Sequence, residues 1–362
     1  MERREKQTMS PSYWKPAAWV LAGSLLLVSC GPKTPTLSGP LPLASASTQM
    51  QWPDPPEPGR IRFLGTLSGP SDLGITKSFW GRIREFFAGR SPEQRILRPY
   101  GVTTDAQGNL YVADTGTRAI HVFNVGEQNY RIIEDGEDLK SPTDIATGPA
   151  DQIFVSDTER GLILKFSSRG KLIEEIGRDT LVRPVGVVFN SVSDLLYVVD
   201  VAQHQVFSYD LDGNLQQRLG RRGTDDGEFN FPTNIATDKR GFLYVTDSLN
   251  FRIQTFDSQG NFVGQFGQPG DSVGNFAKPK GIAVDSEGHI YVVEGLFDTI
   301  LIYDSQGQLL LSFGNPGKDP GEFWLATGIH IDSADRIYVA DSYNSRIQVF
   351  QYLEQGKEPE IR

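Results

Sequence analysis

Six acidic residues recur along the chain, each closing a short apolar unit of the Tyr-Val-x-Asp type. They follow one another at separations of 43, 43, 47, 47 and 47 residues: Asp114, Asp157, Asp200, Asp247, Glu294 and Asp341. Carboxylates that converge can bind a metal ion or act as general acid and base. An acid that every repeat carries is better explained by the repeat itself. We therefore expect these acids to fix a turn in each copy, with arginine partners such as Arg118, Arg252 and Arg346.

The four histidines do not follow the repeat. His121 and His204 fall in third-strand regions of their copies, and His289 begins a second strand. His330 lies in the middle of a first strand. Its side chain is either packed in the fold or acts as a ligand. A zinc site needs three converging ligands. These histidines do not supply them, so we predict no metal site built on histidine.

A period of 40-odd residues is typical of a supersecondary unit that stacks on its neighbours. The fourth copy alternates apolar and polar residues with a period of two, interrupted by turn residues. It predicts four strands at 234–238, 242–246, 252–256 and 261–266. Four antiparallel strands make a propeller blade. The sequence therefore predicts an all-β fold, a six-bladed β-propeller over residues 60–353.

The repeated phrases resemble NHL repeats. The resemblance rests on two motifs: Pro-x-Gly-Ile-Ala-x-Asp at 279–285, and Asn-x-Arg-Ile-Gln-x-Phe at 250–256 and 344–350. The resemblance implies a six-bladed propeller. Among catalytic relatives, the peptide-amidating lyase built on NHL repeats uses a histidine zinc triad, which the histidines here do not match. The calcium-dependent lactonases, also six-bladed, take Glu, Asn and Asp ligands from different blades.

The last copy ends at residues 352–353 without a fourth strand, whereas residues 60–67 have strand character. We predict that this N-terminal strand completes blade six, because a closed ring leaves fewer unpaired edges. The connection 68–98 contains apolar residues at helical spacing before Gly89, which predicts one short amphipathic helix. These residues are Phe79, Trp80, Ile83, Phe86 and Phe87. Three placements stay open: packed over the ring, lying on a membrane surface, or covering a binding mouth.

Polar residues in the first strands are candidate ligands at the mouth of the central channel. They are Tyr100, Asp144, Asn234, Lys280 and His330. Asp144 and Asn234 replace a glycine that stands at this position in the other copies. One interpretation is a small-ligand or cation site, with calcium as the candidate cofactor. The other is that these groups only satisfy exposed strand ends, with no cofactor and no catalysis.

Blade five has lost the Asn-x-Arg phrase and carries Gly295-Leu-Phe-Asp-Thr299 instead. Leu296 and Phe297 would then lie on an exposed loop, where apolar side chains are suited to anchor a partner. The alternative is sequence drift without function.

The N-terminus has the composition of an export signal. Basic residues precede an apolar run of about a dozen residues, which is too short to span a bilayer. Leu27-Val28-Ser29-Cys30 resembles a bacterial lipobox. The resemblance implies a lipoprotein signal peptide, 1–29, with lipidation of Cys30. Residues 30–59 are rich in proline and serine and predict a tether, and residues 354–362 predict a polar tail.

Removal of residues 1–29 takes four basic and two acidic residues from the 35 and 45 of the chain, leaving a net charge of −12. Such a charge disfavours nucleic acid as a partner. The sequence thus predicts a monomeric, lipid-anchored scaffold that binds a protein or extracellular polymer and is not an enzyme. It would sit in the bacterial cell envelope, on the periplasmic or surface side of the outer membrane. The alternative is a metal-assisted hydrolase, lactonase or lyase working at the channel mouth.

Overall fold

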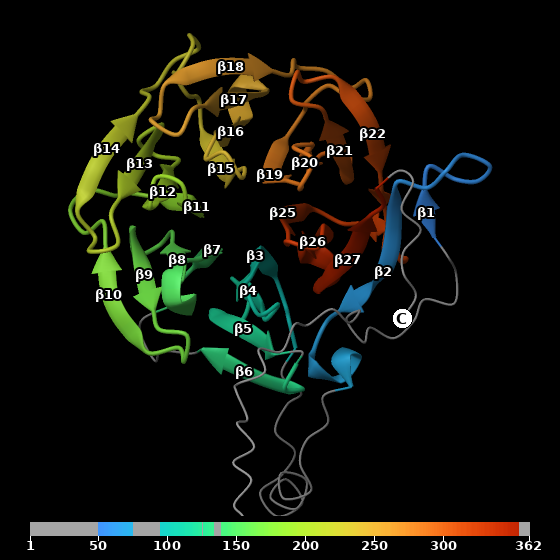
Figure 1. The fold of residues 1–362 in the computed structure, drawn as a ribbon, viewed down its shortest axis with the longest axis horizontal. Helices are drawn as coiled ribbons and strands as arrows, with labels where there is room; N and C mark the ends of the chain where they lie inside the picture. The colour runs from blue at the N-terminus through green and yellow to red at the C-terminus, as the bar shows by residue number, and fades with distance from the viewer. Residues whose placement is uncertain (1–49, 75–94, 125, 134–138, 355–362) are drawn as a thin grey trace, which may run out of the picture. The chain divides into compact units, whose positions relative to one another are not determined.

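The computed structural model describes residues 50–74, 95–124, 126–133 and 139–354. Within them, six antiparallel sheets follow one another around a ring in chain order (Figure 1). The first five blades have four strands each, as the period-two pattern predicts. The fold is a six-bladed β-propeller.

Blades one to four each consist of four strands that are consecutive in the chain. Blade one has β3 (Pro99–Thr104), β4 (Leu110–Asp114), β5 (Ala119–Asn124) and β6 (Asn129–Ile133). Blade two has β7 (Pro142–Thr147), β8 (Ile153–Asp157), β9 (Leu162–Phe166) and β10 (Leu172–Ile176). Blade three has β11 (Pro184–Asn190), β12 (Leu195–Asp200), β13 (Gln205–Tyr209) and β14 (Leu215–Leu219). Blade four has β15 (Pro232–Thr237), β16 (Leu243–Asp247), β17 (Arg252–Phe256) and β18 (Phe262–Phe266).

Blade five has β19 (Pro279–Val284), β20 (Ile290–Glu294), β21 (Thr299–Tyr303) and β22 (Leu309–Phe313). Blade six has β25 (Ala326–Ile331), β26 (Arg336–Asp341), β27 (Arg346–Tyr352), β2 (Ile61–Leu67) and β1 (Gln51–Trp52). The connection between them carries the short parallel pair β23 (Asn315–Pro316) and β24 (Glu322–Phe323). Short 3₁₀ turns are η1 (Pro70–Leu73), η2 (Pro149–Asp151), η3 (Ser248–Asn250) and η4 (Ser342–Asn344).

The core is divided among the interfaces between blades. Each pair of neighbouring blades encloses one cluster of buried apolar side chains in the described part of the chain. One cluster joins Val112 and Phe123 of blade one to Tyr338 and Val349 of blade six. Burying one such side chain contributes about 1.5–3 kcal/mol. A single sheet has nothing to bury its apolar face against, so the stable arrangement is the closed ring.

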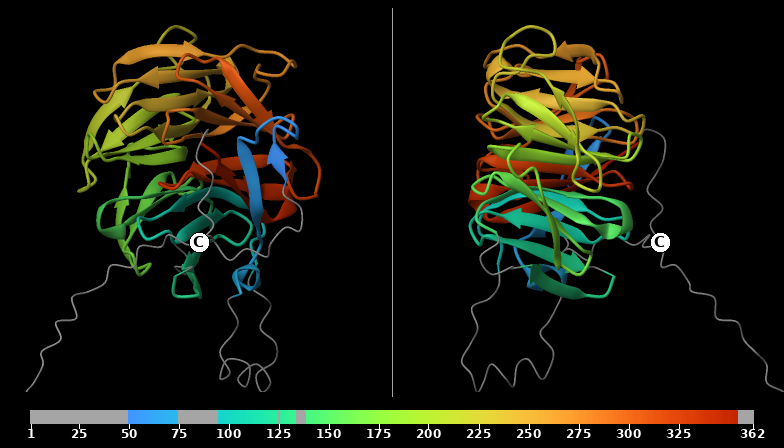
Figure 2. Two further views of the ribbon diagram at one scale, coloured as in Figure 1. Left: turned by 45° about the vertical axis from the view of Figure 1, so that its right-hand side comes forward. Right: turned by 90° about the vertical axis from the view of Figure 1, so that its left-hand side faces the viewer.

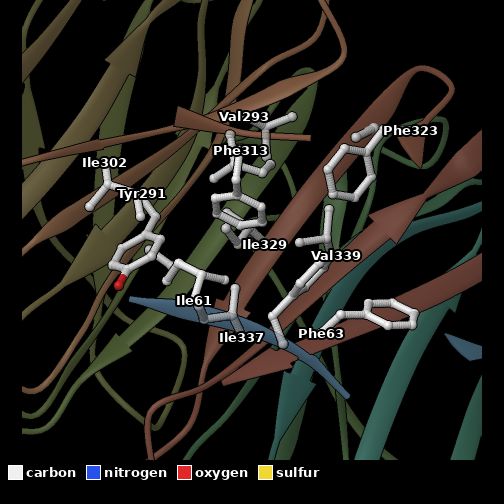
Figure 3. Packing of buried hydrophobic residues seen from close by; sticks show 14 residues of the cluster. Ile61, Phe63, Tyr291, Val293, Ile302, Phe313, Phe323, Ile329, Ile337 and Val339 are labelled. Atoms are coloured by element: carbon white, nitrogen blue, oxygen red, sulfur yellow. The ribbon is translucent and has the colours of Figure 1, made fainter. Parts of the chain in front are cut away.

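The seam of the ring is closed as the sequence predicts. β2 pairs antiparallel with β27, so an N-terminal strand becomes the fourth strand of blade six. Figure 2 shows this blue strand alongside the red strands of blade six. Ile61 and Phe63 of β2 lie among Ile337 and Val339 in the buried cluster (Figure 3).

The start of the folded part is earlier than the sequence indicates. Pattern alone places residues 30–59 in a tether, whereas β1 already pairs with the outer side of β2. The ring of Trp52 lies 5.5 Å from that of Phe313 and 5.8 Å from that of Phe350. Met50 also packs against this cluster. Burial of these apolar side chains extends the propeller to residue 50, despite the prolines that follow.

Phenylalanines fix the three longer connections, which join blade three to four, four to five and five to six. Phe229, Phe276 and Phe323 are fully buried, each in the cluster between the blades that it connects. The predicted amphipathic helix falls within 75–94, outside the described residues. The same holds for Cys30, the signal peptide and residues 355–362. In the described part, no helix is both long and apolar enough to cross a membrane.

Candidate functional site

The repeated acids are structural, as their periodicity indicates. All six are fully buried. Each accepts hydrogen bonds from backbone N–H groups just before the first strand of its own blade. Asp247 Oδ1, for example, lies 2.6 Å from the nitrogen of Asn230. Each acid therefore ties the loop after the second strand to the start of the first.

Arginine supports this tie in two blades. Arg252 Nε lies 2.8 Å from Asp247 Oδ2, and Arg346 Nε lies 2.7 Å from Asp341 Oδ2. The expectation for Arg118 is wrong, because His121 occupies that place, with its Nε2 3.2 Å from Asp114 Oδ2. The side chain of Arg118 is exposed.

The first strands line a central channel that contains a cavity of about 260 Å³. Each strand contributes one aliphatic side chain at the same level: Val102, Ile145, Val187, Ile235, Ile282 and Ile329. Asp144, Asn234 and His330 also line the cavity, so three of the five mouth candidates share one space. Tyr100 and Lys280 are not among its lining residues.

Close approach of neighbouring strands explains the glycines at the mouth. A Cβ atom on Gly328 would lie 2.2 Å from the carbonyl oxygen of Tyr100. A Cβ on Gly101 would lie 2.5 Å from Asp144 Oδ1, so this carboxyl group rests on bare backbone. The Cα of Asp144 would lie 2.6 Å from the same Cβ, so the approach of the two strands itself requires a glycine in blade one.

Asp144 is the group in the channel best suited to exchange a proton near neutral pH. Its Oδ2 accepts a hydrogen bond from the N–H of Val187 at 3.0 Å. Burial raises the pKa of Asp144 to about 7, although the N–H groups of Val187 and Ile145 act in the opposite direction. Burial and the charge of Asp144 also raise the pKa of Tyr100, and Arg183 opposes them.

His330 is held as a neutral imidazole. Its Nε2 accepts the N–H of Thr104 at 3.2 Å and lies 2.8 Å from Thr104 Oγ1. Because Nε2 is the acceptor, the remaining proton sits on Nδ1. Burial lowers the pKa of His330 to about 4, with Asp332 opposing it. The ring is therefore tied to the neighbouring blade in one tautomer.

Asn234 and Lys280 differ in surroundings. Asn234 is buried and lines the cavity. Lys280 is half-buried, and its Nζ donates to the carbonyl oxygen of Ala326 at 3.2 Å. Across the described ranges, no cluster of three or more His, Cys, Asp or Glu side chains could hold a metal ion. The channel thus holds a proton-exchanging carboxyl group and two neutral polar groups.

A second candidate region lies on the face that carries the loops between second and third strands, which we call the top face. Leu296 is 59% exposed and Phe297 is half-buried, so the predicted pair is accessible. The loop that carries them is anchored, because Leu296 N–H donates to Glu294 Oε1 at 3.0 Å. Asp298, also in this loop, accepts the N–H of Leu325 at 2.6 Å.

Further exposed apolar residues lie on the same face and were missed by sequence reasoning. Leu249 and Tyr343 are each 50% exposed. Each follows its acid by two residues, as Leu296 does. Phe231 and Trp324 are 42% and 41% exposed and lie just before the first strands. We call this set the apolar arc: Phe231, Leu249, Leu296, Trp324 and Tyr343.

The loops of the arc are joined to neighbouring segments by backbone hydrogen bonds. Leu249 N–H donates to Asn230 O at 3.0 Å, and Tyr343 N–H donates to Trp324 O at 3.1 Å. The rings of Trp324 and Tyr343 lie 5.8 Å apart. A signal was present in the sequence, because Leu249, Leu296 and Tyr343 recur at 47-residue spacing. The same loop position in blades one to three holds Gly116, Glu159 and Ala202.

Comparison with known proteins agrees with this fold. A family model described as the NHL repeat matches residues 323–350. A second model, described as a 6-bladed beta-propeller, matches residues 224–308. The protein is a six-bladed β-propeller, and its last blade matches the NHL repeat model.

Individual relatives are distant. A probable peptidyl-alpha-hydroxyglycine alpha-amidating lyase from Caenorhabditis elegans is 32% identical over 111 residues, which are 27% of this chain and 29% of that protein. This match therefore spans less than a third of the relative's length.

Solved structures resemble the fold at low identity. An auxiliary nutrient binding protein from Bacteroides thetaiotaomicron superposes with a TM-score of 0.57 and 17% identity, covering 71% of this chain and 69% of that one. A gluconolactonase from Xanthomonas campestris gives 0.54 and 17%, covering 74% and 93%. At such identities the likeness shows the fold alone, which hosts unrelated functions.

Proposed function

We propose that this propeller is a lipid-anchored binding protein of the bacterial cell envelope that holds a protein or polymer on its top face. The apolar arc carries this proposal. Large apolar side chains in exposed loops do not stabilise the fold, whereas they supply binding energy when a partner covers them. Their repetition at one loop position in three consecutive blades favours one continuous surface over scattered exposure.

The channel supports catalysis less well, because its polar groups are bound to the fold. Asp144 accepts the N–H of Val187, and His330 accepts from Thr104 of the next blade. In the top-face loops, backbone groups are hydrogen-bonded whereas apolar side chains project outward. Such rigid presentation lowers the entropy lost when a partner binds.

Attachment to the membrane rests on the lipobox-like sequence before Cys30. The chain that follows reaches the folded part at residue 50, where Met50 and Trp52 pack on the propeller. We expect that Cys30→Ala releases the protein from the membrane fraction of the expressing cells. Retention of this variant in membranes would contradict the anchor.

The decisive experiment replaces Leu249, Leu296 and Tyr343 together with serine. Partners cross-linked to the wild-type protein in intact cells should be lost from this variant. A matched control replaces Ile173, Val192 and Val263, which are 51%, 53% and 54% exposed and lie outside the arc. The control should retain the partners, and both variants should unfold at the wild-type denaturant midpoint. Equal recovery with both variants would contradict the proposal.

A hydrolase or lyase remains the second candidate, and the shared cavity of Asp144, Asn234 and His330 favours it. A carboxyl group with a pKa of about 7 is suited to general acid or base catalysis. Purified mature protein can be assayed on lactones with and without added calcium. Turnover that disappears in Asp144→Asn while the fold persists would favour this candidate.

A further inference from the structure

At one position just before the first strands, cations occupy alternate blades around the channel mouth. The residue just before the proline that opens the first strand is Arg98, Arg183 and Lys278 in blades one, three and five. The corresponding residues in blades two, four and six are uncharged: Ser141, Phe231 and Leu325. Because the blades follow one another around a ring, the three cations surround the mouth.

The backbone of these three residues is fixed while their side chains are exposed. Their N–H groups donate to the buried acids of their own blades. The distances are 2.9 Å for Arg98, 3.0 Å for Arg183 and 2.7 Å for Lys278. Within residues 50–74, 95–124, 126–133 and 139–354, none of the three forms an ion pair. Arg98 instead lies over the ring of Tyr343, 5.4 Å from its centre.

Lys280, the second residue of β19, adds a fourth positive charge two residues after Lys278. Its ammonium group is half-buried and bonded to the carbonyl oxygen of Ala326, and its aliphatic stem packs on Gly295. Burial lowers the pKa of Lys280 to about 8, with a smaller contribution from the charge of Lys278, while the charges of Asp298 and Glu294 act in the opposite direction. A partly desolvated cation beside another cation is stabilised when an anion approaches both.

The positive mouth stands out because the chain as a whole has a net charge of −10. At the far ends of the first strands, the turns carry acids, among them Asp105, Asp238, Asp285 and Asp332. Exposed charges act over about 8–10 Å at physiological ionic strength. These acids lie at the opposite end of the first strands from the mouth, so an acidic segment bound at the mouth lies beyond the range of their charges.

We propose that Arg98, Arg183, Lys278 and Lys280, the cation collar, bind an acidic segment of the partner protein. The adjoining apolar arc receives apolar side chains of the same segment, since Arg98 stacks on Tyr343 where collar and arc meet. This inference rests on the proposed function and narrows it to a protein partner with carboxylates interspersed among large apolar residues.

The test uses a fluorescently labelled decapeptide of alternating Glu and Leu or Phe as the probe, with the full mature chain. Fluorescence anisotropy should show binding that weakens as salt is added. R98Q/R183Q/K278Q should bind at least tenfold more weakly and lose most of the salt dependence. The matched control R169Q/K171Q/K239Q removes the same charge from exposed positions away from the mouth and should bind within about twofold of wild type.

Two results would overturn the proposal that the collar binds an acidic segment. One is no binding of the probe to wild type, and the other is an equal loss of affinity in both triple variants. Equal competition by an oligonucleotide of ten nucleotides or by anionic lipid vesicles would overturn the assignment to a peptide. Lys280 gives an independent readout through the NMR titration of its reductively methylated amine. Its pKa should rise when the probe binds, and an unchanged value would place the anion elsewhere.

Failure of the collar and failure of the proposed function are distinguishable. If the serine variant of the arc binds the probe weakly but keeps the wild-type salt dependence, both surfaces contribute. If it binds as tightly as wild type, the apolar arc is excluded while the collar stands. If it loses cross-linked partners whereas the collar variant retains them, the proposed function stands and the collar is overturned.

Discussion

The channel and the top face differ in how their side chains are satisfied. In the channel, Asp144 and His330 are titratable groups bonded to the backbone of neighbouring blades. On the top face, Leu296 and Trp324 project from backbone that is itself hydrogen-bonded, and the side chains are exposed. The channel residues therefore hold blades together, whereas the top-face residues are free to hold something else. Buried polarity by itself is a poor guide to function in this ring.

The largest effect should come from the ion pair beneath the top-face loops. Arg252 Nη2 donates to the carbonyl oxygens of Asp225 and Glu228 at 2.9 Å each, in addition to its bond with Asp247. Removing one partner of a buried ion pair destabilises by about 3–5 kcal/mol. Arg252→Ala should lower the free energy of unfolding by this amount in a urea titration. Arg118→Ala, on an exposed side chain, should change it by less than about 0.5 kcal/mol. Similar losses of unfolding free energy in the two variants would show that the pair of Arg252 and Asp247 does not hold the loops rigidly.

The next effect is a pH dependence from the channel. Asp144 has a pKa of about 7 in the fold, against an ordinary value of 3.8. Between these pH values the unfolded chain has lost a proton that the folded protein keeps, so this group makes stability fall as pH rises. Asp144→Asn removes this contribution. Relative to wild type, its free energy of unfolding should rise from pH 4 to pH 7 by up to about 4 kcal/mol. Parallel curves for the two proteins would show that Asp144 is solvated.

His330 should act with the opposite sign. Its pKa of about 4 lies below the ordinary 6.5, so the unfolded chain binds a proton that the folded protein excludes. Its contribution is present above pH 6.5 and is lost as pH falls towards 4. His330→Gln keeps an acceptor for Thr104 and removes the titration. Relative to wild type, the variant should gain up to about 3 kcal/mol on acidification across this window. If the variant instead loses stability relative to wild type on acidification, His330 is charged in the fold.

The architecture could be predicted from the sequence because the same strand pattern recurs in six copies. The pairing of β2 with β27 followed from a missing strand in the last copy and a spare one near the N-terminus. Sequence reasoning also placed Asp144, Asn234 and His330 on first strands, and these share one cavity. β1 was missed because two residues among prolines carry no periodicity. Most of the apolar arc was missed because the 47-residue recurrence of Leu249, Leu296 and Tyr343 falls in irregular loops, where no strand periodicity indicates which side chains are exposed.

The order of strands, the number of blades and the need to close the ring were determined by the chain itself, because apolar faces at a fixed period can be buried only against their copies. Which loop side chains become neighbours was decided by the ring. Trp324 meets Tyr343, and Tyr343 in turn lies beneath Arg98, far away in sequence. The first contact lies within blade six, whereas the second arises where the last blade returns to the first, and no local pattern encodes it.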